Sequence, residues 1–477
     1  MSVPTATGRT IEQRSIDYIP WSERHGKLWH QAPFWFSGNF VLPTMVIGFI
    51  GPTIGLSVGY SFLAIVLGAC FGTFFMAFHA NQGPRMGLPQ MIQSRAQFGS
   101  RGVIFPFLAT VFVYVGFSVF NVVLATQGIN LILPGGKWFW YPVVVIVAIV
   151  IAVIGHDLLH FIQRWLVYFL IAAFLVVTIL AFTTLPAPTA AHAGGWNLNA
   201  FLVQFSLAAG YNISYAVYVS DYSRYLPADS SAPKLIFYTY LGAAFSAVWL
   251  MGLGSVLSSR TSVLDPITAL RELGDHLFPG FGTIVVLIST VALISIMGIN
   301  AYGAMLTSVS GIDAFKRVPA SRNTRIIGLS VIGLIIVTIA LLVPKNYLGS
   351  FNNTILLMLY FLIPWTAVNL VDFYTVRHGK YAITEIFNPK GIYGRWSWRG
   401  LVAYFAGFFA MIPFISLTGV FTGPIAAALG GADFSFAIGL IVAGTVYYLL
   451  ARRGIDHEAE AKARHASQMS LEGRDLD

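Results

Sequence analysis

The segment Asn81–Gly99, NQGPRMGLPQMIQSRAQFG, is a polar stretch between two long apolar runs, and it is the most informative part of the chain. It carries Arg85 and Arg95, Arg101 follows directly, and no acidic residue lies between positions 81 and 101. Cytoplasmic loops of membrane proteins carry an excess of lysine and arginine. The segment therefore predicts a cytoplasmic loop between two transmembrane helices.

Composition supports a membrane protein. The 477 residues are 56% hydrophobic and 10% charged, with a mean hydropathy of +0.73. A soluble domain carries about 25% charged residues, and apolar runs of about 20 residues can cross a bilayer core. We predict an all-α polytopic membrane protein. The first 30 residues are polar and mixed in charge, so they indicate no signal peptide.

Twelve apolar segments divide the chain. Their approximate bounds are 32–57, 58–79, 102–131, 138–155, 161–184, 201–220, 235–257, 280–310, 325–343, 353–376, 400–419 and 424–451. They predict twelve transmembrane helices in five regions. These regions are a cytosolic N-tail (1–31), a ten-helix core (32–376), a cytoplasmic linker (377–399), helices 11 and 12 (400–451) and a cytosolic C-tail (452–477).

The distribution of positive charge orients these segments. With the N-terminus inside, 24 of the 28 lysines and arginines fall on the inner side and four on the outer side. This split favours twelve spans in the plasma membrane, with both termini in the cytoplasm. It also explains the net charge of +9 without nucleic acid as a partner.

The apolar segments hold no aspartate, glutamate, lysine or arginine near their centres. Such residues within membranes usually mark ion or proton pathways, so their absence argues against a permanently charged substrate and against a carboxylate proton carrier. The spans show no reactive constellation that would indicate an enzyme. His156 and His160 have a metal-ligand spacing but no third ligand, so we expect no metal site.

Two apolar segments are interrupted by glycine and polar residues. Segment 1 contains Ser37-Gly38-Asn39 followed by Pro43, and segment 6 contains Gly210-Tyr211-Asn212-Ile213-Ser214. Paired broken helices mark the central site of many transporters, although glycine and asparagine also serve plain helix packing. Further polar residues are Tyr114, Ser118 and Asn121 on one face of segment 3, and Ser295 and Asn300 in segment 8. Asparagines plus aromatic rings suit a neutral planar heterocycle.

Four further motifs carry a family resemblance. They are YVSDYSRYLP at 218–227, PWTAVNLVDFY at 364–374, HGKY at 378–381 and GIYG at 391–394. Together with the segment 81–99 they resemble the nucleobase–cation symporter-1 family, in its purine–cytosine permease branch. The resemblance implies a five-plus-five inverted repeat of the sodium-symporter type, in about 32–184 and 201–376, plus two extra helices. It also implies alternating access around a central site.

The resemblance also assigns residues. It places substrate contacts at Tyr114, Ser118, Gly210-Tyr211 and Asn300. It places a sodium site at the carbonyls of Ser37 and Phe40 and the hydroxyl of Ser295, but Ile294 stands where a second hydroxyl is expected. A missing oxygen ligand weakens a cation site, so both Na⁺ and H⁺ stay open as coupling ions.

These observations predict a secondary active transporter, and no enzyme, that imports a neutral nucleobase or related ring of the purine, cytosine, allantoin or hydantoin type. Tyr114 and Tyr211 are expected to stack on the ring. The residues expected to read its edge are Asn39, Ser118, Asn121, Asn212 and Asn300. We expect a monomer without a cofactor in the bilayer. The alternatives are an uncoupled facilitator or channel, and an amino-acid transporter of the same fold.

Overall fold

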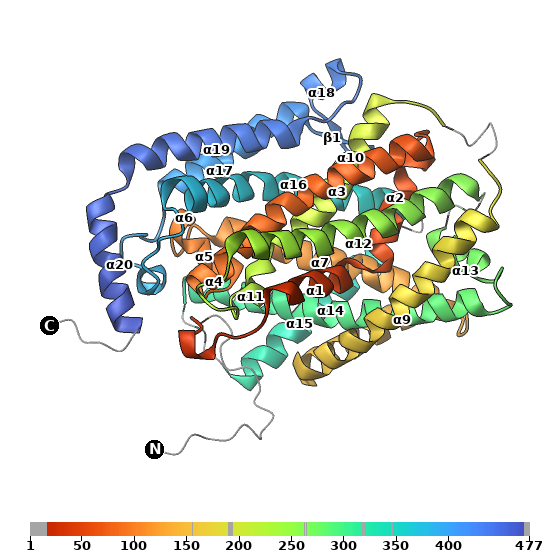
Figure 1. Cartoon of the computed structure of the whole chain (residues 1–477), viewed down its shortest axis with the longest axis horizontal. Helices are drawn as coiled ribbons and strands as arrows, with labels where there is room; N and C mark the ends of the chain where they lie inside the picture. The colour runs from red at the N-terminus through yellow and green to blue at the C-terminus, as the bar shows by residue number, and fades with distance from the viewer. Residues whose placement is uncertain are drawn as a thin grey trace.

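The computed structural model describes residues 17–471 except 155, 189–193, 262, 264, 317, 319–320 and 345–346. Long helices lie side by side with roughly parallel axes, and one helix, α20, crosses an end of the bundle (Figure 1). We call this end the α20 end. The first 16 residues of the predicted N-tail and the last six of the predicted C-tail lie outside the described residues.

Within the described ranges, nine helices are long and apolar enough to cross a membrane, and a bent pair makes up to ten. The nine are built from α3 (Val58–Ala80), α7 (Ile104–Asn130), α9 (His156–Thr183), α10 (Leu198–Ile213) with η3 (Ser214–Val217), α12 (Ala232–Arg260), α14 (Phe281–Asp313), α15 (Arg322–Leu342), α16 (Tyr347–Val371) with the π-helical turn η4 (Asp372–Val376), and α19 (Ser435–Gly454). The bent pair is α1 (Gln31–Asn39) and α2 (Leu42–Thr53), at 63°.

Two predicted spans are shorter apolar helices and account for the difference between ten and twelve. They are α8 (Lys137–Ile154) and α17 (Trp398–Met411) with η6 (Ile412–Phe414). The remaining elements are η1 (Trp21–Glu23), η2 (Leu28–His30), α4 (Gln82–Met86), α5 (Gln90–Gln93), α6 (Arg95–Phe98), α11 (Val219–Ser223), α13 (Pro266–Gly274), η5 (Thr384–Phe387), β1 (Ser416–Leu417), β2 (Phe421–Thr422), α18 (Pro424–Ala428) and α20 (His457–Leu471).

The predicted bounds of helices 11 and 12 were wrong. Helix 11 ends at Phe414 instead of 419, because an antiparallel hairpin of β1 and β2 follows it, with Gly419 at a φ of 73° in its turn. Helix 12 begins at Ser435 instead of 424, after Gly430 and Gly431, both at positive φ. Glycine adopts such backbone angles without steric cost, so these positions end the helices inside a continuous apolar run.

Contacts place eight of the first ten apolar segments in two groups. In one, α12 packs on α1, α2 and α3, and α10 packs on α2 and α3. In the other, α14 packs on α7, α8 and α15, and α15 packs on α7 and α8. The first group holds segments 1, 2, 6 and 7, and the second holds 3, 4, 8 and 9. Each group therefore combines equivalent helices of two five-helix repeats, as the predicted inverted repeat requires.

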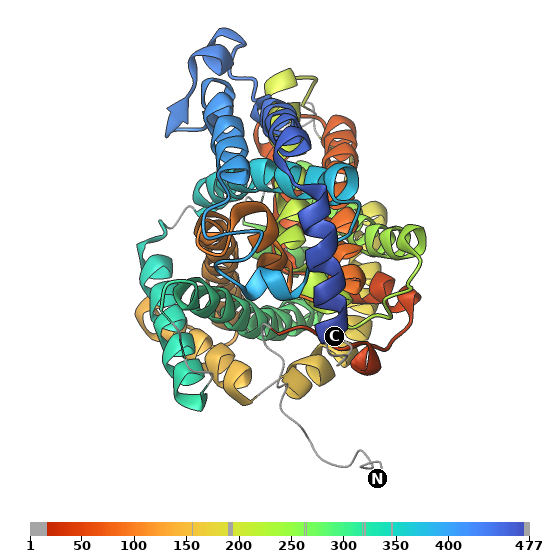
Figure 2. The same cartoon turned by 90° about the vertical axis from the view of Figure 1, so that its left-hand side faces the viewer.

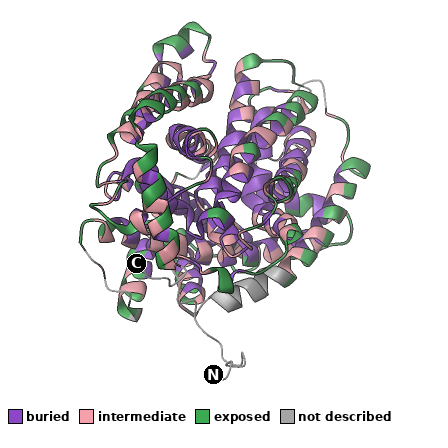
Figure 3. Ribbon diagram, turned by 60° about the vertical axis from the view of Figure 1, so that its left-hand side comes forward, coloured by how far each residue is buried: buried purple, intermediate pink, exposed green. Residues whose placement is uncertain are grey.

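Small residues let the helices of the first group approach closely. A Cβ built on Gly68 would lie 2.3 Å from the carbonyl oxygen of Phe205, and one on Gly72 would lie 2.2 Å from that of Ala209. The sequence Gly68-x-x-x-Gly72 is thus a helix-contact motif between α3 and α10, as expected of small residues in membrane helices. Buried residues concentrate in the middle of the bundle, and the periphery is exposed (Figure 3).

The segment Asn81–Gly99 is packed inside the protein and is not a surface loop. It folds into α4, α5 and α6, and almost all of its residues are buried, Arg85 being exposed. Its glutamines bridge helices: Gln82 Nε2 donates to Asn369 Oδ1 at 2.6 Å, and Gln97 Nε2 donates to Asp372 Oδ2 at 2.6 Å. The segment therefore ties the start of α7 to the end of α16.

A buried ionic cluster continues this connection to the C-terminal helix. Arg377 donates to Asp372 Oδ1 and, from Nε and Nη2, to Glu460 Oε1 of α20 at 3.0 and 2.9 Å. Tyr381 and Tyr447 also donate to Asp372. Burial lowers the pKa of Arg377, but the neighbouring carboxylates outweigh it and keep this pKa above its usual range. Figure 2 shows α20 lying across the helix ends that this cluster joins.

Arg377→Leu is expected to destabilise the protein by about 3–5 kcal/mol, because it leaves two buried carboxylates without their counter-charge. The melting temperature of the purified protein in detergent measures the effect. Lys380→Leu, at an exposed position three residues away, is the matched control and should leave the melting temperature unchanged. Equal melting temperatures for the two variants would show that the cluster contributes little.

Candidate functional site

The first broken helix places its polar residues at the centre of the bundle. α1 ends at Asn39, Phe40 leaves helical geometry at φ −90° and ψ 66°, and α2 resumes at Leu42. Pro43 near the start of α2 has no amide hydrogen to donate, which suits a helix N-terminus. Thr44 Oγ1 donates to the carbonyl of Asn39 at 2.6 Å and so satisfies part of the break.

The second broken helix lies in segment 6, and its break begins at the end of the predicted cluster. α10 continues through Gly210 to Ile213, a 3₁₀ turn covers Ser214–Val217, and Tyr218 at φ −140° and ψ 8° precedes α11. Ser214 Oγ donates to the carbonyl of Tyr211 at 2.5 Å. Both breaks therefore lie in the first helix of a repeat.

Hydrogen bonds join the two breaks directly. Asn39 Nδ2 donates to Asn212 Oδ1 at 3.0 Å and to the carbonyl of Ala243 at 2.9 Å. Asn212 Nδ2 donates to the carbonyl of Ala69 at 3.3 Å, and the hydroxyls of Thr44 and Tyr211 lie within hydrogen-bond distance of each other, at 2.9 Å. Asn39 and Asn212 are buried and use their amides on the protein itself, so they position the broken helices.

A cavity of about 60 Å³ lies between the broken helices, α7 and α14. Its walls are mainly aromatic and carry two amides, Asn121 and Asn300. The lining residues are Phe34, Trp35, Gly38, Val41, Pro43, Phe117, Asn121, Tyr211, Tyr215, Tyr218, Tyr222, Ile296, Ile299 and Asn300. None of these lining residues carries a formal charge.

Three of the predicted substrate residues line this cavity: Asn121, Tyr211 and Asn300. Asn121 is 2% exposed, and its Oδ1 has no hydrogen-bond partner within the described part of the chain. A buried acceptor without a partner is costly, so a donor on a bound molecule would stabilise it.

The other predicted substrate residues are not among the lining residues. Besides Asn39 and Asn212, Ser118 Oγ donates to the carbonyl of Tyr114 at 2.8 Å. The ring of Tyr114 stacks on Tyr218 at 5.3 Å and fills the space beside Gly303. A Cβ on Gly210 would lie 3.0 Å from the carbonyl of Ile355, so this glycine serves the contact between α10 and α16.

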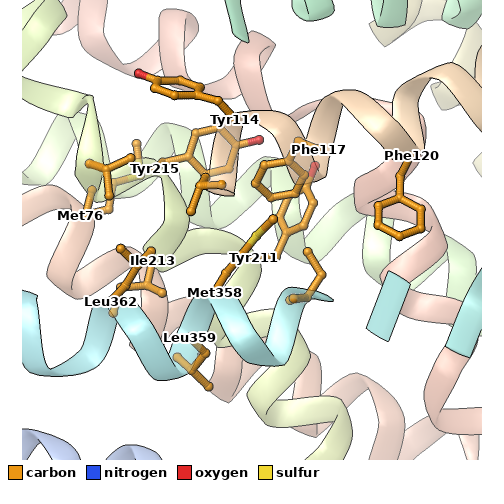
Figure 4. Packing of buried hydrophobic residues seen from close by; sticks show 14 of the residues in the cluster. Met76, Tyr114, Phe117, Phe120, Tyr211, Ile213, Tyr215, Met358, Leu359 and Leu362 are labelled. Carbon is orange, nitrogen blue, oxygen red and sulfur yellow. The ribbon is translucent and has the colours of Figure 1, made fainter. Parts of the chain in front are cut away.

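The residues that α7 presents to the cavity are Phe117 and Asn121, three positions after the predicted pair Tyr114 and Ser118. The spacing of four residues is the same, so the aromatic ring and the polar group still share one helix face. Figure 4 shows Phe117 beside Tyr211, with Phe120 further along α7. The centroids of Phe117 and Tyr211 lie 5.2 Å apart in an edge-to-face arrangement.

Sequence reasoning missed five aromatic residues that line the cavity on the two broken helices, which are Phe34, Trp35, Tyr215, Tyr218 and Tyr222. A signal for three of them was present. Tyr211, Tyr215, Tyr218 and Tyr222 follow one another at steps of 4, 3 and 4, which is the spacing of one helix face.

The residues considered for a cation are at the first break and in α14. Ser37 and Phe40 flank Asn39, and the carbonyl of Ser37 accepts from the amide of Phe40 at 3.3 Å. Ser295 is 1% exposed, and its hydroxyl has no partner within the described part of the chain. His156 and His160 lie outside the residues whose side chains are described. The described remainder holds no group of three or more metal-ligand side chains.

Paired broken helices, two intermixed five-helix repeats and a cavity between them define a multi-pass membrane transporter. Residues 18–439 match the family described as permeases for cytosine/purines, uracil, thiamine and allantoin. The chain belongs to this family, the purine–cytosine permease branch of the nucleobase–cation symporter-1 proteins, and it is a transporter and not an enzyme.

Individual proteins agree with this assignment. YxlA of Bacillus subtilis (strain 168), which is named for purine-cytosine permeases, is 39% identical over 92% of this chain and 96% of its own length. The inward-facing structure of Mhp1 superposes with a TM-score of 0.73 at 18% identity, over 96% of this chain and 98% of Mhp1. A closed structure of Mhp1 with bromovinylhydantoin bound gives 0.72 at 16% identity, over 96% and 100%. These likenesses establish the inverted-repeat fold.

Proposed function

We propose that the protein is a secondary active transporter that imports a neutral planar heterocycle, a nucleobase or a close analogue, together with a cation. The observation that carries this proposal is the cavity itself, in which aromatic rings surround the amides of Asn121 and Asn300. Rings offer faces for stacking, and amides offer both a donor and an acceptor to the edge of a base.

The central contacts follow from the walls of the cavity. Phe117 and Tyr211, with ring centroids 5.2 Å apart, provide the aromatic surface. Asn121 from α7 and Asn300 from α14 provide the polar edge. Because the two helices belong to one helix group and Tyr211 belongs to the other, a ligand bound here touches both groups. Relative movement of the two groups around such a ligand is the basis of alternating access.

The lining also separates the alternatives. An amino acid carries an ammonium and a carboxylate, and burying either without a partner charge is costly. The cavity wall has no charged side chain to serve as that partner, which favours a neutral base. The family contains permeases for purines and cytosine, and YxlA carries a name of this type. Both support the same substrate class.

Orientation and coupling complete the proposal. The protein lies in the plasma membrane, and both of its termini face the cytoplasm, as the distribution of lysine and arginine predicts. The coupling cation is Na⁺ or H⁺, and Ser37, Phe40 and Ser295 are the residues that would contribute to a sodium site.

A ligand screen tests the substrate class. Binding to the folded state raises the melting temperature, so purified protein is screened against adenine, hypoxanthine, cytosine, uracil, allantoin, a hydantoin and a set of amino acids. We expect stabilisation by at least one planar base and by none of the amino acids. Stabilisation by amino acids alone would contradict the proposal and favour the same-fold alternative.

A further inference from the structure

The cavity extends well beyond its two amides, toward the α20 end of the bundle. Its wall includes Asn121, Asn300 and Tyr211, and it also includes Phe34 and Trp35 of α1 and Tyr222 of α11. α1 and α11, which carry these last three rings, lie nearer the α20 end than α2 and α10 (Figure 1). A molecule that leaves the amides toward this end must pass these rings.

Tyr211, Tyr215 and Tyr218 form a series of ring contacts along the second broken helix. The centroid distances are 5.9 Å from Tyr211 to Tyr215 and 5.6 Å from Tyr215 to Tyr218. These separations fall in the range in which aromatic pairs attract each other. The series begins at the central contacts, since Phe117 lies 5.2 Å from Tyr211, and it reaches Tyr222 through Trp35, whose ring lies 6.2 Å from Tyr218 and 5.6 Å from Tyr222.

Two aromatic residues of the first broken helix, Phe34 and Trp35, pack against this series. Trp35 makes edge-to-face contacts with Tyr215 at 6.1 Å and with Tyr222 at 5.6 Å, and Phe34 lies 4.7 Å from Tyr222. Trp35 is 2% exposed, and its Nε1 donates to Gln31 Oε1 at 3.0 Å, which fixes the indole ring. We call Trp35, Tyr215, Tyr218 and Tyr222 the aromatic clasp.

We infer that the aromatic clasp is the exit route of the transporter: a flat ring moves from the amides to the α20 end by exchanging stacking contacts from one clasp residue to the next. The inference rests on the proposed function and adds residues that determine the rate and selectivity of passage. When the rings of the aromatic clasp separate, they lose their contacts with one another. A planar unsaturated ligand replaces these contacts by stacking on the separated rings. A saturated or branched molecule cannot stack in this way, so its passage requires the full free energy of separating the rings.

Tyr222 is the residue for a direct test, because it is half-buried and belongs to α11, whereas the two amides belong to α7 and α14. Tyr222→Leu keeps an apolar side chain but removes the ring. We expect its maximal rate of cytosine uptake into proteoliposomes to fall about tenfold, which corresponds to roughly 1.4 kcal/mol and to one or two lost ring contacts. Its cytosine Kd, measured by calorimetry, should stay within about twofold of the wild-type value because the central contacts are intact.

Tyr222→Phe is the matched control, since it keeps the ring and removes only the hydroxyl. It should retain the wild-type uptake rate and Kd within about twofold. Trp35→Leu and Trp35→Phe repeat the comparison on the other side of the clasp, with the same expected difference.

An unchanged or faster rate for Tyr222→Leu would overturn the inference. So would a Kd that rises in parallel with the loss of rate, or a Tyr222→Phe variant as slow as Tyr222→Leu. These results concern the clasp alone when the wild-type protein transports cytosine or another base. A wild-type protein that neither binds nor transports any base overturns the proposed function together with this inference.

Discussion

Asn300→Ala is expected to lower the uptake of the base strongly at low base concentrations, while leaving the amount of protein in the membrane unchanged. Asn300 lines the cavity together with the aromatic residues, and alanine cannot replace either its donor or its acceptor. Two hydrogen bonds at about 0.5–1.5 kcal/mol each correspond to a loss of about 5- to 150-fold in affinity. Calorimetry on purified protein and initial rates of uptake measure the two effects.

Asn121→Ala should behave in the same way, because the buried Oδ1 of Asn121 has no partner within the described part of the chain. Asn323→Ala, at an exposed position at the start of α15, is the control and should bind and transport normally. Wild-type affinity in Asn300→Ala or Asn121→Ala would remove that residue from the site. Loss of membrane expression in either variant would point to a structural role.

Gly72→Ala is expected to have the largest effect on folding for the smallest chemical change. The added methyl group would lie 2.2 Å from the carbonyl oxygen of Ala209, and this neighbour is backbone of α10. α3 and α10 must therefore separate, at a cost of about 1–3 kcal/mol or more for an overpacked core. Tyr211 is only two residues from Ala209, so the aromatic wall of the cavity shifts with the helix.

A matched control for Gly72 lies on the same helix. A Cβ built on Gly59 would meet no atom within 4 Å, so Gly59→Ala should be neutral or slightly stabilising, because alanine favours helix more than glycine does. We expect a lower melting temperature and a weaker base affinity for Gly72→Ala and neither change for Gly59→Ala. Equal behaviour of the two variants would contradict the close contact between α3 and α10.

The parts of the fold that sequence reasoning predicted depend on signals that the membrane itself imposes. Long apolar runs gave the helices, and Pro43 together with Ser37-Gly38-Asn39 gave the first break. The bounds of helices 11 and 12 could not be predicted, because the apolar residues around Gly419, Gly430 and Gly431 hide the turns. The burial of Asn81–Gly99 was also missed, because partner residues such as Asn369 and Asp372 lie almost 300 positions away.

The site was predicted less completely, because a polar residue in a helix does not reveal which neighbour it faces. Asn39 and Asn121 look alike in the sequence, yet Asn39 bonds to Asn212 and Ala243, whereas Asn121 faces the cavity. The register on α7 shifted by three residues for the same reason, since Tyr114 and Phe117 are both aromatic residues followed by a polar side chain four positions later. Three-dimensional packing decides between such candidates.

Accumulation of radiolabelled cytosine by proteoliposomes tests the central claim most directly. The vesicles contain purified wild-type protein, and uptake is followed under an inward sodium gradient, an inward proton gradient, both gradients, or neither. A coupled transporter raises the internal concentration above the external one, and collapse of the driving gradient removes the excess. We predict such accumulation under at least one of the gradients, with adenine and hypoxanthine as further bases in the same assay. Equilibration without accumulation under every gradient, for every base that enters, would contradict cation-coupled transport and identify a facilitator.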